Sequence, residues 1–465
     1  MTTRRQLLKA LAVLPAAGSI PVALRPAPAQ AAPSGDGSQA MAWRNWSGLQ
    51  VAHPRHRAAP KDKDELRTLI TKSQGVIRPI GAGHSFTPLM NTDETLVSLD
   101  RMQGLLDYDN RTQQATVAGG TRLFNLGREL EEIGQALPNM PDIAEQSLAG
   151  ALGTATHGTG AELGAMPAYV EELTLMTADG SEISCSRHNN ADLFQAARVN
   201  LGALGFITAV RLQNKPAYRL EKTLDWRPIE DILAESEQLA DRHRNFEFFY
   251  IPFSGWGFVD MQDLTEAEPT ATETTDQNEG LYTLQRIRDW LSWSPRLREF
   301  SMGLYMRTLP TEYSVAPSWE TYTHTRAVRW NEMEYHLPRE DGLKAFREIR
   351  TLIEEQFPEV FFPIEVRYIK QDDIWLSPFF EQDSISIAVH RYYAEDHRPL
   401  FEAIEPIFRR YGGRPHWGKL HSLKGDELAA LYPHWNDFLD VRQQLDPKGR
   451  FLNSYLRELF DLKEA

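Results

Sequence analysis

Apolar and polar positions follow two different periods along the first half of this chain. A spacing of three to four residues predicts amphipathic helices over residues 61–74 and 121–136, and Gly134 is a stop signal for the second helix. Short apolar runs predict strands at residues 75–80, 94–102, 113–120 and 201–214. Residues 170–186 predict a hairpin. This half of the chain therefore predicts strands and helices in alternation.

The pattern changes near residue 216. Aromatic side chains accumulate over residues 246–261, and residues 265–280, which are acidic and rich in threonine, are typical of a surface loop. One helix and two strands are predicted at residues 341–357, 364–370 and 384–393. No internal repeat is evident in the sequence. The second half therefore predicts a separate domain built on a mixed sheet.

Composition indicates a well-packed globular protein of two or three domains. The chain has 465 residues, of which 42% are hydrophobic and 25% are charged. Its net charge is -14, and removal of residues 1–31, which hold four basic residues and no acidic one, would leave -18. Such an acidic surface argues against binding of nucleic acid and suits a small neutral substrate. Cys185 is the only cysteine, which excludes an internal disulfide and a thiolate-rich metal site.

The N-terminus has the pattern of an export signal. A basic start with Arg4 and Arg5 is followed by an apolar stretch and by a small-residue cleavage site at residues 29–31. The arginine pair resembles a twin-arginine signal, a route that exports folded proteins. A general secretory signal and a membrane anchor are the alternatives, and the short, proline-interrupted apolar run disfavours the anchor. We expect a twin-arginine signal peptide at residues 1–31, a flexible leader at 32–42, and a periplasmic or extracellular location.

Two glycine-rich stretches are candidates for a cofactor site. Residues 79–85 place His84 on a turn directly after a predicted strand, with neither the Rossmann glycine spacing nor a P-loop lysine. Residues 147–160 are rich in glycine, alanine and hydroxyl side chains, which let a planar ligand approach the backbone closely. A simple turn in the first stretch and a tightly packed helix–sheet crossing in the second are the alternatives that these residues leave open.

Charged residues in the second half are candidates for substrate contacts. Alternation along a strand places Glu365 and Arg367 on one face, either as a buried ion pair or as a charged pair aimed into a pocket. His390 ends the next strand-like run and can lie on a neighbouring strand, although a structural histidine is the commoner case there. Lys419 lies either at the surface or among apolar residues, where a desolvated lysine loses its charge readily and can serve as a base.

The order of these motifs resembles that of a known flavoprotein family. Along the chain come the runs WRNWSG, PIGAGHSFTPL, SLAGALGTATHGTG, VNLGALGFITAV, EVR, HWGK and LDPKGRFLNSYL. This series is similar to that of the aldonolactone and alditol oxidases, including D-arabinono-1,4-lactone oxidase, which are vanillyl-alcohol-oxidase-type flavoproteins. The likeness runs from Trp43 to the C-terminus.

The resemblance implies an α+β fold with two domains. We expect an FAD-binding domain at residues 43–215, a mixed-sheet substrate (cap) domain at 216–418, and a C-terminal segment at 419–465 that returns to the FAD-binding domain. The FAD domain is therefore split along the chain.

The resemblance also implies FAD as the cofactor, bound covalently through His84 to the flavin 8α-methyl group. Such a tether would raise the flavin potential and prevent cofactor loss after export. Because Cys185 lies far away in sequence, a single covalent bond is expected. The other positions that match cofactor contacts are Pro79, Ile80, Gly81, Ala82, Gly83, Ser85, Ser147, Gly150, Thr154, Ala155, Thr156, His157 and Ile207.

One stretch departs from the family pattern. Asp142 stands where alditol oxidases place a serine that reaches both flavin and substrate, so we count it among the cofactor-site residues. Pro141, just before it, holds a position that influences oxygen access in the family. A carboxylate at position 142 changes what the pocket can bind, so specificity for a simple polyol does not follow from the resemblance.

The implied reaction is oxidation of an alcohol carbon in a sugar alcohol or aldonolactone. A hydride passes to the flavin, and O2 takes the electrons to give hydrogen peroxide. Lys419 is the candidate base if its pKa is depressed. Arg367 stabilises the developing alkoxide, and Glu365 orients the hydroxyl groups of the substrate. His390 also matches a substrate-site residue of the family.

Three alternatives remain at this point. The first is a dehydrogenase that passes electrons to a quinone or cytochrome, and the second is a non-redox periplasmic sugar-binding protein. The third, a histidine-based metal hydrolase, lacks any HExxH-like spacing, so no metal is expected.

Overall fold

The structure is a computed structural model that describes residues 42–270, 277–291, 293–323 and 328–462. The predicted signal peptide and almost all of the predicted leader therefore lie outside the described residues. In the described part, no helix is both long enough and apolar enough to cross a membrane.

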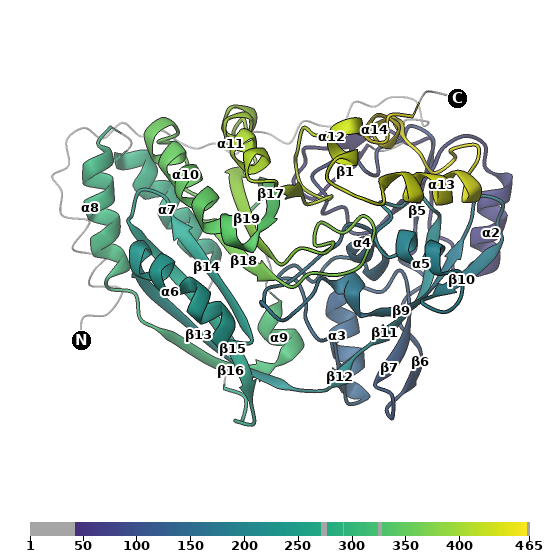
Figure 1. Ribbon diagram of the computed structural model, residues 1–465, viewed down its shortest axis with the longest axis horizontal. Helices are drawn as coiled ribbons and strands as arrows, with labels where there is room; N and C mark the ends of the chain where they lie inside the picture. Colours follow the sequence, from purple (N-terminus) through teal and green to yellow (C-terminus); the bar gives the residue numbers. More distant parts are fainter. Residues whose placement is uncertain (1–41, 271–276, 292, 324–327, 463–465) are drawn as a thin grey trace, which may run out of the picture. The chain divides into compact units, whose positions relative to one another are not determined.

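Besides two two-stranded pairs, β1 (Trp43–Arg44) with β2 (Val51–Ala52) and β8 (Gln135–Ala136) with β12 (Lys215–Pro216), the first half of the chain builds two larger sheets (Figure 1). The smaller is parallel, with strands in the order β3 (His56–Ala58), β5 (Thr95–Ser98) and β4 (Ile77–Ile80). The larger is antiparallel, in the order β10 (Glu182–Ser186), β9 (Val170–Met176), β11 (Phe206–Gln213), β7 (Gln114–Ala118) and β6 (Leu105–Asp109). The predicted hairpin is confirmed as the β9–β10 pair.

Both helices predicted in this half form. Helix α2 (Lys63–Lys72) begins after Asp62, whose carboxylate accepts a hydrogen bond from the backbone N–H of Glu65. Helix α3 (Leu123–Glu132) ends just before Gly134, which has the positive φ of +77° that a glycine supplies at a helix C-terminus. The remaining helices of this half are short and comprise α4 (Leu148–Gly153) and α5 (Ala191–Ala197).

One large sheet dominates the second half. Its eight strands run in the order β16 (Glu312–Pro317), β13 (Arg219–Pro228), β15 (Trp256–Thr265), β14 (Asn245–Ile251), β18 (Ile364–Ile369), β19 (Ser384–Tyr392), β17 (Trp330–Pro338) and β20 (Arg414–Pro415). All neighbouring pairs are antiparallel, so the expectation of a mixed sheet is wrong.

The large sheet is antiparallel because the same strand–helix–strand connection occurs twice. Strand β13 leads through α6 (Ile229–Arg242) to β14, and β15 then returns between these two parallel strands. Strands β17, β18 and β19 are joined in the same way, through α10 (Arg339–Gln356). Because an antiparallel strand separates each parallel pair, no parallel neighbours remain. Each crossover helix begins after a proline, Pro228 or Pro338, and carries two acidic residues in its first turn.

Helices cover the second half unevenly. Helices α6, α10 and α11 (Arg398–Arg410) lie along one face of the large sheet (Figure 1). The other helices are α7 (Gln277–Leu291), α8 (Pro295–Met306), α9 (Ser318–Tyr322), α12 (Gly425–Ala429), α13 (Trp435–Leu445) and α14 (Ser454–Leu459). The expected loop at 265–280 is wrong at its end, because α7 already begins at Gln277 and its amphipathic spacing lets it pack against α8.

The C-terminal residues contact elements of the first half. Helix α13 packs against α5, and the backbone N–H of Ile77 donates to the carbonyl of Arg450 over 2.8 Å. Phe451 shares an apolar cluster with Leu66 and Ile70 of α2. Residues Ala40–Ala465 form a single compact unit, and the boundaries at 215 and 418 stay a prediction.

Candidate active site

A pocket brings the two glycine-rich stretches together. Its cavity volume is about 140 Å³, and the cavity is partly open to solvent. Of the residues predicted to contact a cofactor or substrate, those that line it are Pro79, Ile80, Gly81, Ala82, Gly83, His84, Ser85, Ser147, Gly150, Thr154, Ile207 and Lys419. The loop that follows β4 therefore lies opposite α4, and a residue of the HWGK run reaches the same space.

Glycines make the pocket wall from backbone. A Cβ on Gly119 would lie 2.0 Å from the carbonyl oxygen of Ile207, and one on Gly120 would lie 2.0 Å from that of Leu99. A Cβ on Gly81 would lie 2.3 Å from the Ser147 hydroxyl oxygen. No side chain fits at these positions, which leaves bare backbone facing the pocket and suits close approach by a large cofactor. Gly119 and Gly120 are not among the predicted contacts. The sequence feature that could have indicated them is the pair of glycines at the end of the strand predicted at residues 113–120.

His84 sits at the pocket in an apolar setting. Its ring stacks on Trp46 with a centroid separation of 5.4 Å, and its Nδ1 is buried without a hydrogen-bond partner in the described part of the chain. Burial, with smaller contributions from Lys419 and Arg122, lowers the pKa of His84 to about 4. The ring is therefore neutral at pH 7, His84 lines the glycine-walled pocket, and one of its ring nitrogens is buried without a partner in the described part of the chain. These observations fit a residue that bonds to a cofactor.

A buried arginine holds the pocket loop in place. Arg78 donates from Nε to the carbonyl of Leu89 over 2.8 Å, and from its Nη atoms to those of Leu201 and Gly202 over 2.8 and 2.9 Å. It also contacts the carbonyl of Phe451. Burial lowers the pKa of Arg78 to about 9. The side chain thus ties β4 to the 200–202 turn and to the C-terminal segment, a role that the sequence analysis missed.

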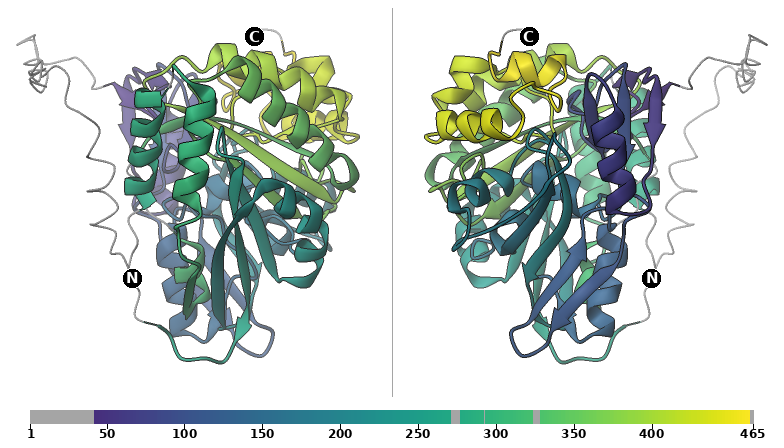
Figure 2. Two further views of the ribbon diagram at one scale, coloured as in Figure 1. Left: turned by 90° about the vertical axis from the view of Figure 1, so that its left-hand side faces the viewer. Right: turned by 90° about the vertical axis from the view of Figure 1, so that its right-hand side faces the viewer.

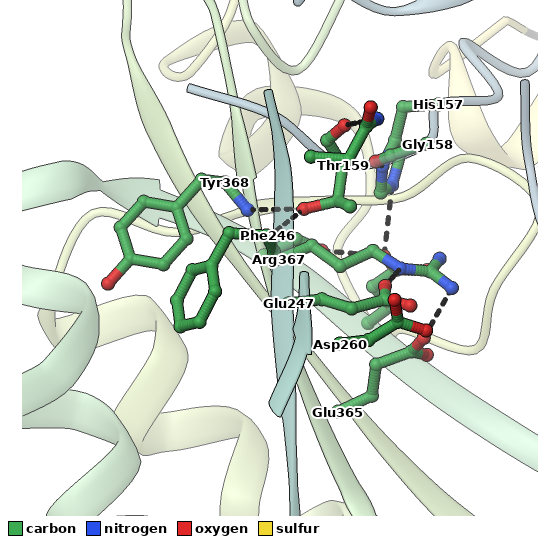
Figure 3. Close-up of polar contacts among 12 residues, drawn as sticks. His157, Gly158, Thr159, Phe246, Glu247, Asp260, Glu365, Arg367 and Tyr368 are labelled. Atoms are coloured by element: carbon green, nitrogen blue, oxygen red, sulfur yellow. Dashed lines mark hydrogen bonds and ion pairs between the residues drawn. The ribbon is translucent and has the colours of Figure 1, made fainter. Parts of the chain in front are cut away.

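Glu365 and Arg367 lie on one face of β18, as predicted, and they form an ion pair. Arg367 Nε also donates to Glu247 of β14 over 2.7 Å, because Glu247 and Arg367 are direct cross-strand partners (Figure 3). Glu365, which is buried, and Glu247, which is largely buried, thus share one guanidinium. Neither Glu365 nor Arg367 lines the pocket. Burial raises the pKa of Glu365 well above its usual range, and the neighbouring carboxylates add to this effect while Arg367 opposes it. Although burial opposes it, the charge of Glu365 and Glu247 raises the pKa of Arg367.

Asp142 is part of the same charged environment. It does not line the pocket, yet its charge acts on both Glu365 and Arg367, and also on the buried Lys222. Lys222 Nζ lies 2.6 Å from the carboxylate of Asp260, which sits beside Glu247 and Arg367 in Figure 3. Asp142 is half-buried and therefore contributes its charge to the cluster of charged residues on the large sheet. Pro141 is buried. Contact of Asp142 with a cofactor stays a prediction.

Lys419 is held between two carboxylates of β17. Its Nζ lies 2.6 Å from Glu332 Oε2 and 3.7 Å from Glu334 Oε2. Burial lowers the pKa of Lys419, but these two charges more than compensate and the net pKa is raised above 10.5. This direction is opposite to the depressed pKa under which Lys419 is expected to act as a base, and its role as the base stays a prediction. The sequence signal for this environment is the alternation of Glu332 and Glu334, which puts both carboxylates on one face of β17.

His390 lies on β19, next to β18, as anticipated. It is the cross-strand partner of Glu332, and its Nε2 lies 3.7 Å from the carboxylate of that residue. Its Nδ1 lies 3.0 Å from the carbonyl of Pro363, and burial lowers the pKa of His390. His390 does not line the pocket, and its contact is with Glu332, the residue that pairs with Lys419.

Three predicted cofactor contacts, Ala155, Thr156 and His157, do not line the pocket. His157 Nε2 lies 3.0 Å from Glu334 Oε1, and its Nδ1 lies 2.8 Å from the carbonyl of Gly158. Both interpretations of the second glycine-rich stretch therefore apply to part of it. Helix α4 faces the pocket, as expected for a cofactor site, while the residues that follow α4 pack against the large sheet. Cofactor contact by these three residues stays a prediction.

Fold and site together define a flavoprotein of the vanillyl-alcohol-oxidase type. The structure superposes on cholesterol oxidase from Brevibacterium sterolicum with a TM-score of 0.75, covering 90% of this chain and 96% of that one at 16% sequence identity. Residues 54–186 match an FAD binding domain, and residues 210–459 match the D-arabinono-1,4-lactone oxidase family. The chain therefore belongs to the D-arabinono-1,4-lactone oxidase family of FAD-dependent oxidoreductases.

Full-length relatives agree with this assignment. The chain is 35% identical to the L-gulono-1,4-lactone dehydrogenase of Mycobacterium tuberculosis, over 90% of this chain and 98% of the relative. It is 31% identical to the L-gulonolactone oxidase of Mus musculus, over 91% and 99%. It is 29% identical to the alditol oxidase of a Streptomyces species, over 90% and 98%.

Proposed function

We propose that this protein oxidises an alcohol carbon of a sugar lactone or sugar alcohol, with FAD as the hydride acceptor and O2 as the final acceptor. One observation carries the proposal: Lys419 lines the glycine-walled pocket and also pairs with Glu332 of the large sheet, so the cofactor pocket and the charged cluster share one boundary. A non-redox sugar-binding protein has no use for an FAD-binding domain, so that alternative is set aside.

The pocket residues would hold the cofactor through backbone. Gly81 to Ser85, with Ser147 and Gly150, would face it, and His84 would be bonded to it. FAD, when bound, supplies the acceptor for the hydride that leaves the alcohol carbon. Cys185 is buried in the apolar core, and burial raises the pKa of its thiol to about 12, so a second covalent bond through a thiolate is not expected.

The charged cluster would bind and deprotonate the substrate. The ammonium of Lys419 stays protonated and stabilises the developing alkoxide. Arg367 holds the carboxylates of Glu365 and Glu247 in place. Glu365 is our candidate for the group that takes the hydroxyl proton, because burial raises its pKa and thereby its affinity for a proton. Asp142 adds negative charge to this wall and favours neutral, hydroxyl-rich substrates over anionic ones.

Anaerobic mixing with L-gulono-1,4-lactone and with xylitol tests the proposal. Bleaching of the flavin absorbance by at least one of these substrates is expected. An oxidised spectrum that no lactone or alditol changes would contradict it.

A dehydrogenase is the second candidate, because a relative at 35% identity bears that name. Turnover under air separates the two. The oxidase releases one hydrogen peroxide for each substrate oxidised, whereas the dehydrogenase turns over only with an added electron acceptor.

We further propose export through the twin-arginine route. Support comes from the arginine pair, the apolar stretch and the small-residue site within residues 1–31. Cell fractionation tests it: replacement of Arg4 and Arg5 by lysine is expected to retain the flavoprotein in the cytoplasm. Unchanged export of that variant would contradict the route.

A further inference from the structure

The helical hairpin formed by α7 (Gln277–Leu291) and α8 (Pro295–Met306) exposes an unusual amount of apolar surface. The two helices lie side by side in the left view of Figure 2. Six of the twelve exposed large apolar side chains in the described part of the chain belong to this hairpin, namely Tyr282, Trp290, Trp293, Leu297, Phe300 and Leu304. The exposed fractions are 74% for Trp290, 75% for Trp293 and 70% for Phe300. Exposed apolar groups gathered in this way mark an interaction surface.

The exposed residues of α8 form a stripe. Leu297, Phe300 and Leu304 are three and four residues apart, which puts them on one face of the helix. The opposite face is buried, with Met302 and Met306 in an apolar cluster of the protein body. Helix α8 is therefore apolar on both sides, and only one side has a partner within the described part of the chain.

Buried arginines fix the hairpin to the rest of the protein. Arg288 of α7 donates to the carbonyl of Glu359 over 2.9 Å and to the carboxylate of Glu395 over 2.7 Å. Arg298 of α8 donates to the carbonyl of Val360 over 2.7 Å. The hairpin is thus held in one orientation, and its apolar stripe points outward because the inner face is already anchored.

The hairpin has a small excess of basic residues although the chain is acidic. Residues 277–307 contain five arginines and three acidic residues, in a chain with a net charge of -14. Arg286, Arg296 and Arg307 are exposed. Tryptophan, phenylalanine and leucine beside exposed arginines is the composition of helices that lie in a membrane interface, where anionic lipids attract the cationic side chains.

We propose that the α7–α8 hairpin is a docking surface for an anionic lipid bilayer, on which the protein lies without crossing it. Trp290, Trp293 and Phe300 enter the headgroup boundary, and Arg286 and Arg296 contact lipid phosphates. A second copy of this chain is the competing occupant, because a two-fold contact can pair the exposed arginines of one copy with Asp289 and Glu299 of the other. The exposed tryptophans favour a membrane interface, and the experiments below separate the two occupants.

Flotation with lipid vesicles tests the proposal on the exported flavoprotein without residues 1–31, because the apolar stretch of the predicted signal peptide would bind lipid by itself. Vesicles of phosphatidylcholine, with and without phosphatidylglycerol, serve as probes. The variant Trp290→Ser/Trp293→Ser/Phe300→Ser is expected to bind phosphatidylglycerol vesicles at least tenfold more weakly than the unmodified protein. The matched control replaces three apolar residues that are exposed elsewhere, Leu106→Ser, Leu264→Ser and Tyr313→Ser, and should bind normally. Flavin absorbance and the melting temperature verify that both variants fold.

A second variant tests the electrostatic part. Replacing Arg286, Arg296 and Arg307 by glutamine should weaken binding about fivefold per arginine and remove most of its salt dependence. Absence of vesicle binding by the unmodified protein would overturn the proposal. So would equal binding by the triple serine variant, which would assign lipid contact to another part of the chain. A dimer of the unmodified protein that the serine variant abolishes, without vesicle binding, would assign the surface to a second copy.

Discussion

The ammonium of Lys419 lies 2.6 Å from the carboxylate of Glu332, which joins the HWGK run to the middle of strand β17. Glu332 is buried, and the charge of Lys419 is the main influence that keeps its pKa low against the opposing effect of burial. Each group therefore keeps the other ionised. The pair places a fixed positive charge at the pocket, so we propose a different residue for the proton-accepting role.

Loss of the Lys419 charge should slow catalysis. Lys419→Met is expected to lower the rate of flavin reduction about 10²- to 10³-fold, because a preorganised cation next to the alkoxide is removed. Rapid mixing under anaerobic conditions measures this rate. Lys419→Arg, which keeps the charge, is the control and should retain more of the activity. A rate in Lys419→Met within twofold of the unmodified protein would contradict the assignment.

The same substitution should destabilise the fold. Removing Lys419 leaves the buried carboxylate of Glu332 without its ion-pair partner, which costs about 3 kcal/mol of unfolding free energy. This value is at the low end for buried ion pairs because 18% of the Lys419 side chain is exposed. Chemical denaturation measures it. The double variant Lys419→Met/Glu332→Gln should recover part of the loss, and strict additivity of the two substitutions would show that the residues do not interact.

Glu365 should impose a pH dependence on the reaction. Its pKa is raised in the folded protein, so flavin reduction should accelerate as the pH rises through that pKa and the carboxyl loses its proton. The linked stability has the opposite trend, since a raised pKa stabilises the fold at low pH and this contribution is lost as the pH rises through the folded value. Glu365→Gln should abolish the pH-dependent limb of the reduction rate, and its persistence would assign the limb to another group.

His84 should carry the covalent bond. Acid precipitation of the unmodified protein should leave the yellow colour in the pellet, whereas the colour of His84→Ala should pass into the supernatant. The prediction depends on a neutral imidazole with a buried, unpartnered nitrogen. Flavin that stays in the pellet of His84→Ala would place the bond on another residue.

The glycine wall should tolerate no side chain. Gly120→Ala is expected to reduce FAD content and to destabilise the fold by about 1–3 kcal/mol, because its Cβ would lie 2.0 Å from the Leu99 carbonyl oxygen. Gly280→Ala is the matched control, since a Cβ there meets nothing within 4 Å. Its FAD content should be normal and its stability unchanged or slightly higher. Equal FAD content in the two variants would show that the wall can shift.

Local patterns in the sequence predicted the elements of the first half because their signals lie within one element. The amphipathic spacing of α2 and α3, the glycine stop at Gly134 and the β9–β10 hairpin need no information from elsewhere in the chain. Alternation likewise placed Glu365 and Arg367 on one face. The two proline-initiated helices that follow β13 and β17 were visible in the sequence at Pro228 and Pro338, but their spacing is too wide and their surroundings too different to indicate a repeat.

By itself, the sequence determined the glycine-walled loop, the family and the residue types that the pocket contains. The tertiary structure alone decided their charge states. The pKa of Lys419 is raised because Glu332 and Glu334 approach it from another strand, and the pKa of Glu365 is raised because the fold buries it and places Glu247 beside the same arginine. The pKa of a buried group is set by desolvation and by charges within a few ångströms, and those charges come from segments that only the fold brings together.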